Sequence, residues 1–118
     1  MYGRTKLMNI LFNRELARRS AGTGVTANCL HPGFVATRFG DQSGGLMQLI
    51  IGVGKRFAIT PEQGAETIIH LASSPEVEGK SGGYYHKSRV DTPSRAAQND
   101  TSARRLWEVS AKLTGLGF

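Results

Sequence analysis

The 118-residue sequence predicts an α/β fold in which helices cover a small parallel sheet. Three observations predict it. An apolar pattern of helical period over Tyr2–Arg19 is followed by a run typical of a buried strand, residues 25–30. The same order recurs as a helix at 60–73 and a strand at 83–86, before a last helix from 99 to about 113. Such alternation favours parallel strands joined by crossover helices.

The first helix is expected to be buried on more than one side. Its apolar residues cover a wide arc, at Leu7, Met8, Ile10, Leu11, Phe12 and Leu16. Glycines at positions 22 and 24 are expected to end it. Small or apolar residues then fill the strand at 25–30, and Pro32 and Gly33 end that strand.

The later elements carry clear start signals. Thr60, Pro61 and Gln63 form the pattern of a capping box with proline in the first turn. Asn99 is the expected N-cap of the last helix. Residues 37–45 and 87–97 are predicted to be irregular. A weak amphipathic helix is predicted at 46–57, directly after the first of these segments. Two predicted strands are too few for a covered sheet, so the chain is expected to be incomplete or to depend on a partner.

Composition and charge exclude several classes of function. The net charge is +6, but no run of five like charges occurs, which argues against a nucleic-acid binder. A single cysteine, Cys29, excludes a disulfide framework and favours an intracellular location. No metal site is expected, because the three histidines lack metal-ligand spacing. No signal-peptide pattern is present, and the apolar run at 46–53 is too short to span a bilayer.

Tyr2 and Lys6 form the first candidate catalytic pair. A tyrosine hydroxyl has a pKa near 10, so proton exchange near neutral pH requires a cationic neighbour. A lysine four residues later on the same helix face can supply that charge. The phenol could then protonate a carbonyl oxygen or deprotonate an alcohol. Many helices contain such a pair by chance, so the spacing alone leaves a purely structural role open.

A second candidate site follows the strand at 25–30. Ligands of open α/β sheets bind outside the carboxyl ends of the strands, where Pro32 and Gly33 lie. Gly33 permits close approach of backbone to a ligand, and Thr37 offers a hydroxyl and an N–H group. A plain strand-to-loop turn remains equally compatible with these residues.

The motifs resemble the short-chain dehydrogenase/reductase family, in its retinol-dehydrogenase-like branch. Residues 2–7 and 9–19 are similar to its catalytic helix, and residues 25–37 to its sixth strand and nicotinamide loop. Thr-Pro-Glu-Gln-Gly-Ala at 60–65, Ser-Gly-Gly-Tyr-Tyr at 81–85 and Ala-Arg-Arg-Leu-Trp-Glu-Val-Ser at 103–110 match the distal half of that branch.

The resemblance implies a role for each matching residue. Tyr2 would be the general acid/base, and Lys6 would lower its pKa and hold the nicotinamide ribose. The nicotinamide side of an NADP or NAD cofactor, with NADP mildly favoured, would be lined by Pro32, Gly33, Val35 and Thr37. Residues 46–57 would form a lid over a lipophilic alcohol or carbonyl substrate. The alternative for this segment is an ordinary helix packed on the surface.

Departures from the family pattern limit this expectation. The glycine-rich fingerprint is missing, and the family's substrate-polarising serine should precede Tyr2 and has no counterpart. The resemblance therefore implies the C-terminal half of a Rossmann-type doubly wound parallel sheet, with residues 1–118 as part of one NAD(P)-binding domain. The chain is expected to be inactive alone. The alternative is a non-catalytic module that forms homo-oligomers through the helix Tyr2–Arg19.

Overall fold

The computed structural model describes residues 2–33 and 59–117, with Tyr2 only as a backbone position in a helix. The elements in chain order are α1 (Tyr2–Arg19), β1 (Cys29–His31), α3 (Pro61–Ser73), the 3-10 helix η1 (Pro75–Val77), β2 (Tyr84–His86), β3 (Arg89–Val90), the 3-10 helix η2 (Arg95–Gln98) and α4 (Asp100–Thr114). The predictions for residues 37–45 and 46–57 lie outside the described residues.

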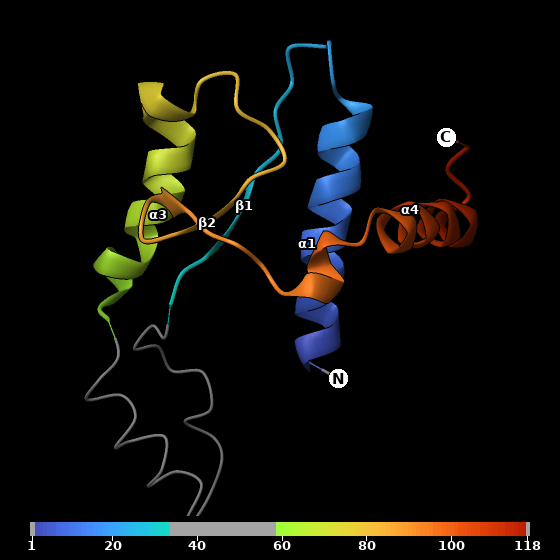
Figure 1. Cartoon of the computed structure of the whole chain (residues 1–118), viewed down its shortest axis with the longest axis horizontal. Helices are drawn as coiled ribbons and strands as arrows, with labels where there is room; N and C mark the ends of the chain where they lie inside the picture. Colours follow the sequence, from blue (N-terminus) through green and yellow to red (C-terminus); the bar gives the residue numbers. More distant parts are fainter. Residues whose placement is uncertain (1, 34–58, 118) are drawn as a thin grey trace, which may run out of the picture.

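The described strands form one mixed three-stranded sheet in the order β1-β2-β3. β1 pairs with β2 in parallel, with Leu30 beside Tyr85, so the parallel pairing of the two predicted strands is confirmed. β3 pairs antiparallel to β2, which corrects the expectation that residues 87–97 are irregular. α1 and α3 lie on opposite sides of the sheet in Figure 1.

The first strand is shorter than predicted, because β1 begins at Cys29 rather than at Val25. Before that point side chains supply part of the pairing, beside one backbone hydrogen bond from the Gly82 N–H to the Ala27 carbonyl oxygen at 2.7 Å. The Ala27 N–H donates to Ser81 Oγ at 3.0 Å, and the Gly83 N–H donates to Asn28 Oδ1 at 3.0 Å. Such local bonds compete with regular sheet pairing. The segment therefore runs beside residues 80–83 without being a regular strand.

The helix starts follow the sequence signals. Thr60 accepts a hydrogen bond from the Gln63 N–H at 3.2 Å, and the Gln63 side chain accepts from the Thr60 N–H at 2.9 Å. This completes the predicted capping box of α3. Asn99 Oδ1 accepts from the Ser102 N–H at 2.8 Å and caps α4. The caps explain why both helices begin where the sequence predicts.

The best-covered part of the core lies where α1 meets η2 and α4. Leu11 of α1, Ala97 of η2 and Ala103 of α4 are all buried. The Phe12 and Trp107 rings stack with centroids 5.3 Å apart, and the Arg19 guanidinium lies 4.8 Å from the Trp107 ring centroid. The two small, fully covered alanines allow η2 and α4 to approach α1 closely.

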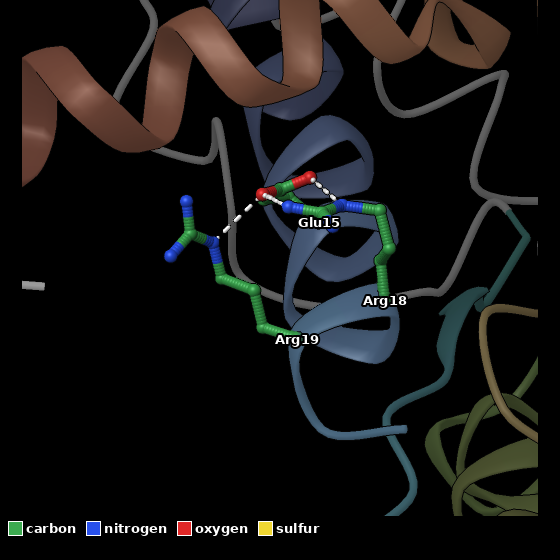
Figure 2. A network of polar contacts seen from close by, with 3 residues as sticks. All are labelled: Glu15, Arg18 and Arg19. Carbon is green, nitrogen blue, oxygen red and sulfur yellow. Dashed lines mark hydrogen bonds and ion pairs between the residues drawn. The ribbon is translucent and has the colours of Figure 1, made fainter. Parts of the chain in front are cut away.

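A carboxylate on α1 is held by two arginines of the same helix (Figure 2). Glu15 is buried and accepts from Arg18 at 2.6 and 2.9 Å and from Arg19 at 2.7 Å. These hydrogen bonds, led by those from Arg18, lower the pKa of the Glu15 carboxyl from 4.5 to about 2. Arg14 reaches across to Asp100 at the start of α4, at 2.5 Å. Charge therefore ties α4 to α1 beside the apolar contact.

None of the helices in the described ranges combines the length and the apolar content needed to cross a membrane.

Candidate functional site

The predicted catalytic pair lies in the first two turns of α1. Tyr2 is the first residue of the helix, and its side chain lies outside what the structure describes. Lys6 is exposed and follows one turn later, on the same helix face. The start of α1 and the end of β1 point to the same end of the molecule, at the bottom of Figure 1. The fold thus directs the predicted catalytic pair and the predicted strand-end site to one side.

Pro32 and Gly33 lie at the carboxyl end of β1 and line a pocket of about 400 Å³. The pocket opens between this strand end, the first turns of α3 and the end of β2. Its other lining residues are Ile59, Gln63, Glu66, Thr67, His86 and Lys87. Lys6 is not among them. Val35 and Thr37, the remaining predicted cofactor-binding residues, lie outside the described residues.

Gly33 is required by both backbone conformation and space. Its φ of +86° lies in the left-handed region that favours glycine. A Cβ at this position would lie 3.2 Å from Ile59 Cδ1 and 3.8 Å from His86 Nε2. A side chain here would therefore strain the backbone and push into the residues that shape the pocket.

His86 ends β2 and turns one edge of its ring toward Gly33. Its ring stacks on His31, the register partner in β1, with centroids 5.1 Å apart. The opposite nitrogen, Nδ1, lies 3.9 Å from Asp91 Oδ2. Stacking on His31 orients the ring and leaves Nε2 on the side of Gly33.

The turn from β2 to β3 places Lys87 at the pocket. Lys87 and Ser88 both have positive φ, 51° and 59°, although neither is glycine or asparagine. The Ser88 N–H donates to Thr67 Oγ1 at 3.0 Å, and Thr67 is only 4% exposed. A buried side chain of α3 thus holds the turn in a conformation that its sequence does not favour.

A larger hollow of about 800 Å³ lies at the opposite end of the sheet, near Gly22, Ser74 and Glu78. It faces the segment that enters β1 rather than the carboxyl ends of the strands. Parallel strands bind ligands at their carboxyl ends, so the smaller pocket at Gly33 is the better site candidate. Among the described residues, no group of three histidine, cysteine or acidic side chains could hold a metal ion.

Sequence reasoning predicted Pro32 and Gly33 but missed His86, Lys87 and the α3 residues of this pocket. The signal for His86 was its position at the end of a predicted strand.

Cys29, predicted to be a small buried residue, is half-buried. Burial raises the pKa of its thiol, and its Sγ lies 3.6 Å from the Gly83 carbonyl oxygen.

Known proteins match almost the whole chain. Retinol dehydrogenase 14 of Homo sapiens is 46% identical over 120 residues, which cover 98% of this chain and 35% of that protein. Retinol dehydrogenase 11 of Homo sapiens is 43% identical over 115 residues, 98% of this chain and 36% of that protein. The WW domain-containing oxidoreductase of Homo sapiens is 38% identical over 95% of this chain and 27% of its own length. No protein-family model matches the chain.

The chain is a homologue of the retinol-dehydrogenase branch of the short-chain dehydrogenase/reductase family. This confirms the resemblance found in the sequence motifs. The chain spans about a third of the length of the retinol dehydrogenases it matches. The catalytic roles of Tyr2 and Lys6 and the cofactor-binding role of Pro32 and Gly33 stay predictions.

Proposed function

We propose that the chain is the catalytic-helix part of an NAD(P)-dependent oxidoreductase that interconverts a lipophilic alcohol and a carbonyl compound. The observation that carries this proposal is the 46% identity to a retinol dehydrogenase over 98% of the chain. The fold supports it, because the β1–β2 pair and the helices on both sides suit the C-terminal part of a Rossmann-type sheet.

The residues at the end of β1 fit the nicotinamide end of a cofactor. Gly33 has a positive φ of +86° at the carboxyl end of β1, where its backbone groups would face the ring of a bound nicotinamide. Pro32 supplies an apolar surface beside it. Lys6 supplies a cation for the ribose hydroxyls. When bound, the cofactor would supply or accept the hydride. We expect Val35 and Thr37 to complete this part of the site.

The chain's own contribution to the reaction would be a proton. Tyr2 would donate its phenolic proton to the carbonyl oxygen of the substrate, or accept a proton from an alcohol in the reverse direction. Lys6, one turn along α1, would lower the phenol pKa by stabilising the phenolate. Lys6 is exposed in the structure.

The proposal is tested in a chimera. The matched 120-residue segment of human retinol dehydrogenase 14 is replaced by this chain, and the rest of that protein is kept. We expect the chimera to reduce a lipophilic aldehyde with NADPH or NADH. The 118-residue chain alone is expected to show no turnover. A folded chimera without turnover would refute the proposed function.

A dimerisation module is the second candidate. Met8 and Phe12 on α1 are 48% and 47% exposed, which is high for large apolar side chains on a packed helix. In that case the chain would self-associate at micromolar concentration and bind no nicotinamide cofactor. Sedimentation velocity of the wild type and of a Met8→Glu variant distinguishes the two candidates.

A further inference from the structure

The pocket at the end of the β1–β2 pair joins an apolar wall to nitrogen-bearing side chains. Ile59 and Pro32 form the wall, and His86 and Lys87 carry the nitrogen atoms. Its volume of about 400 Å³ is that of a small-molecule site. We propose that this pocket binds the carboxylate end of an amphiphilic ligand, with Lys87 and His86 as its partners. The inference rests on the proposed function and narrows its substrate class to a lipophilic alcohol or carbonyl compound that also carries a carboxylate.

The first argument is the position of Lys87 in a strained turn. A two-residue hairpin turn with positive φ at both positions favours asparagine and glycine. Here the positions hold Lys87 and Ser88, and each such non-glycine residue is held in a sparsely populated conformation. The buried Thr67 hydroxyl holds the turn through the Ser88 N–H at 3.0 Å. The chain thus keeps a lysine at the pocket where another residue would stabilise the hairpin.

The second argument is the fixed ring of His86. It is stacked on His31 at 5.1 Å, and its Nδ1 lies 3.9 Å from an Asp91 carboxylate oxygen. Nε2 lies on the Gly33 side of the ring, 3.8 Å from the place where a Cβ of Gly33 would stand. A ring held by stacking can offer Nε2 to a ligand oxygen at little cost in side-chain entropy.

The third argument is charge. Glu66 and Lys87 both line the pocket and are exposed, yet within the described ranges no ion pair joins them. The lysine charge is therefore available to a ligand carboxylate, while Glu66 opposes it from the α3 side. This opposition gives a sharp test, because loss of the Glu66 charge should strengthen binding of an anion and weaken binding of a cation.

The experiment uses the isotope-labelled 118-residue chain and three ligands of equal chain length: decanoate, decanol and decylamine. Binding is followed at pH 7 by NMR shifts of the Gly33, Lys87 and Ser88 amides. We expect decanoate to bind most tightly. Lys87→Asn, which retains a residue suited to the turn, should weaken decanoate binding about tenfold. Lys87→Arg should restore it, Glu66→Gln should tighten it, and the distant Lys80→Gln should leave it unchanged.

A structural role of Lys87 predicts a different pattern. Lys87→Gly should raise the unfolding temperature, because glycine adopts the positive φ of the turn without strain. If Lys87 had only a structural role, this variant would still bind decanoate as tightly as the wild type. Equal affinity for decanol, stronger binding of decylamine, or an unaltered affinity of Lys87→Asn for decanoate would each overturn the proposal. Because no cofactor or turnover is needed, an inactive chimera with intact decanoate binding would refute the oxidoreductase function alone.

Discussion

Two regions differ in their charges and their backbone conformation: the contact of α1 with η2 and α4, and the pocket at the end of β1. Where α1 meets η2 and α4, Ala97 of η2 is 0% exposed and Ala103 of α4 is 1% exposed, and the buried Glu15 carboxylate of α1 accepts hydrogen bonds from two arginines of the same helix. At the pocket, the backbone of Gly33 has positive φ, as have the two residues of the β2–β3 turn. The oppositely charged side chains that line it form no ion pair with each other within the described ranges.

This difference separates stability from function within one small chain. Satisfied charges and small buried side chains stabilise the helix pair. Strained backbone and open charge lower stability, and they persist where the surrounding structure holds them in place. Thr67 and the stacked histidines provide that support at the pocket. Substitutions at the two regions should therefore affect different measured quantities.

The largest expected effect is on catalysis. In the chimera with human retinol dehydrogenase 14, Tyr2→Phe should lower kcat about 10³-fold, because the proton donor to the carbonyl oxygen is lost. The unfolding temperature should stay within about 2 °C of the unsubstituted chimera, since one hydroxyl in the first turn of a helix contributes little to stability. Tyr84→Phe, on β2, serves as the matched control. Turnover retained by Tyr2→Phe would remove α1 from the reaction centre.

The helices were predictable from the sequence because their signals are local. Thr60 with Gln63, and Asn99 with its following turn, specify helix starts within three residues. The β2–β3 hairpin was missed because its turn contains no glycine or asparagine, so no local signal marks it. Its stability comes from Thr67, 21 residues earlier in the chain.

The candidate site was predictable only in part, for the same reason. Pro32 and Gly33 stand in a local motif after a strand. His86 and Lys87 reach Gly33 only through the register of β1 with β2, which pairs residues 55 positions apart. Nothing in the spacing of histidines along the chain indicates that His31 and His86 stack. Long-range pairing thus decides which side chains complete the pocket.

The next largest effect concerns the glycine of the pocket. Gly33→Ala should lower the free energy of unfolding by about 2–3 kcal/mol, from positive φ together with the contact to Ile59. Gly22→Ala is the control, because Gly22 has φ +80° but a Cβ added there would meet nothing within 4 Å. It should cost only about 1–2 kcal/mol. Urea denaturation of both variants measures the difference; equal losses would mean that space at Gly33 is not restricted.

A smaller effect is expected at the helix pair. Glu15→Gln should lower the free energy of unfolding by about 1–2 kcal/mol, because the arginines lose their buried anionic partner. The reduction stays modest since Arg18 and Arg19 are partly exposed, at 54% and 33%, and water screens the attraction. Glu108→Gln removes an exposed contact of 4.0 Å to Arg105 and should cost almost nothing. Decanoate binding should be unaffected by either change.

The smallest effect is the pH dependence of the Glu15 network. The pKa of Glu15 is about 2 in the folded chain and 4.5 as the ordinary value, so the folded state favours the ionised form. Its contribution to stability is complete above pH 4.5 and is lost as the pH falls toward 2. Urea midpoints of the wild type and Glu15→Gln should therefore differ at about pH 6 and converge near pH 2. Glu108→Gln should follow the wild type at both values. A gap between the wild type and Glu15→Gln that stays constant with pH would mean that Glu15 stabilises the helix by packing rather than by its charge.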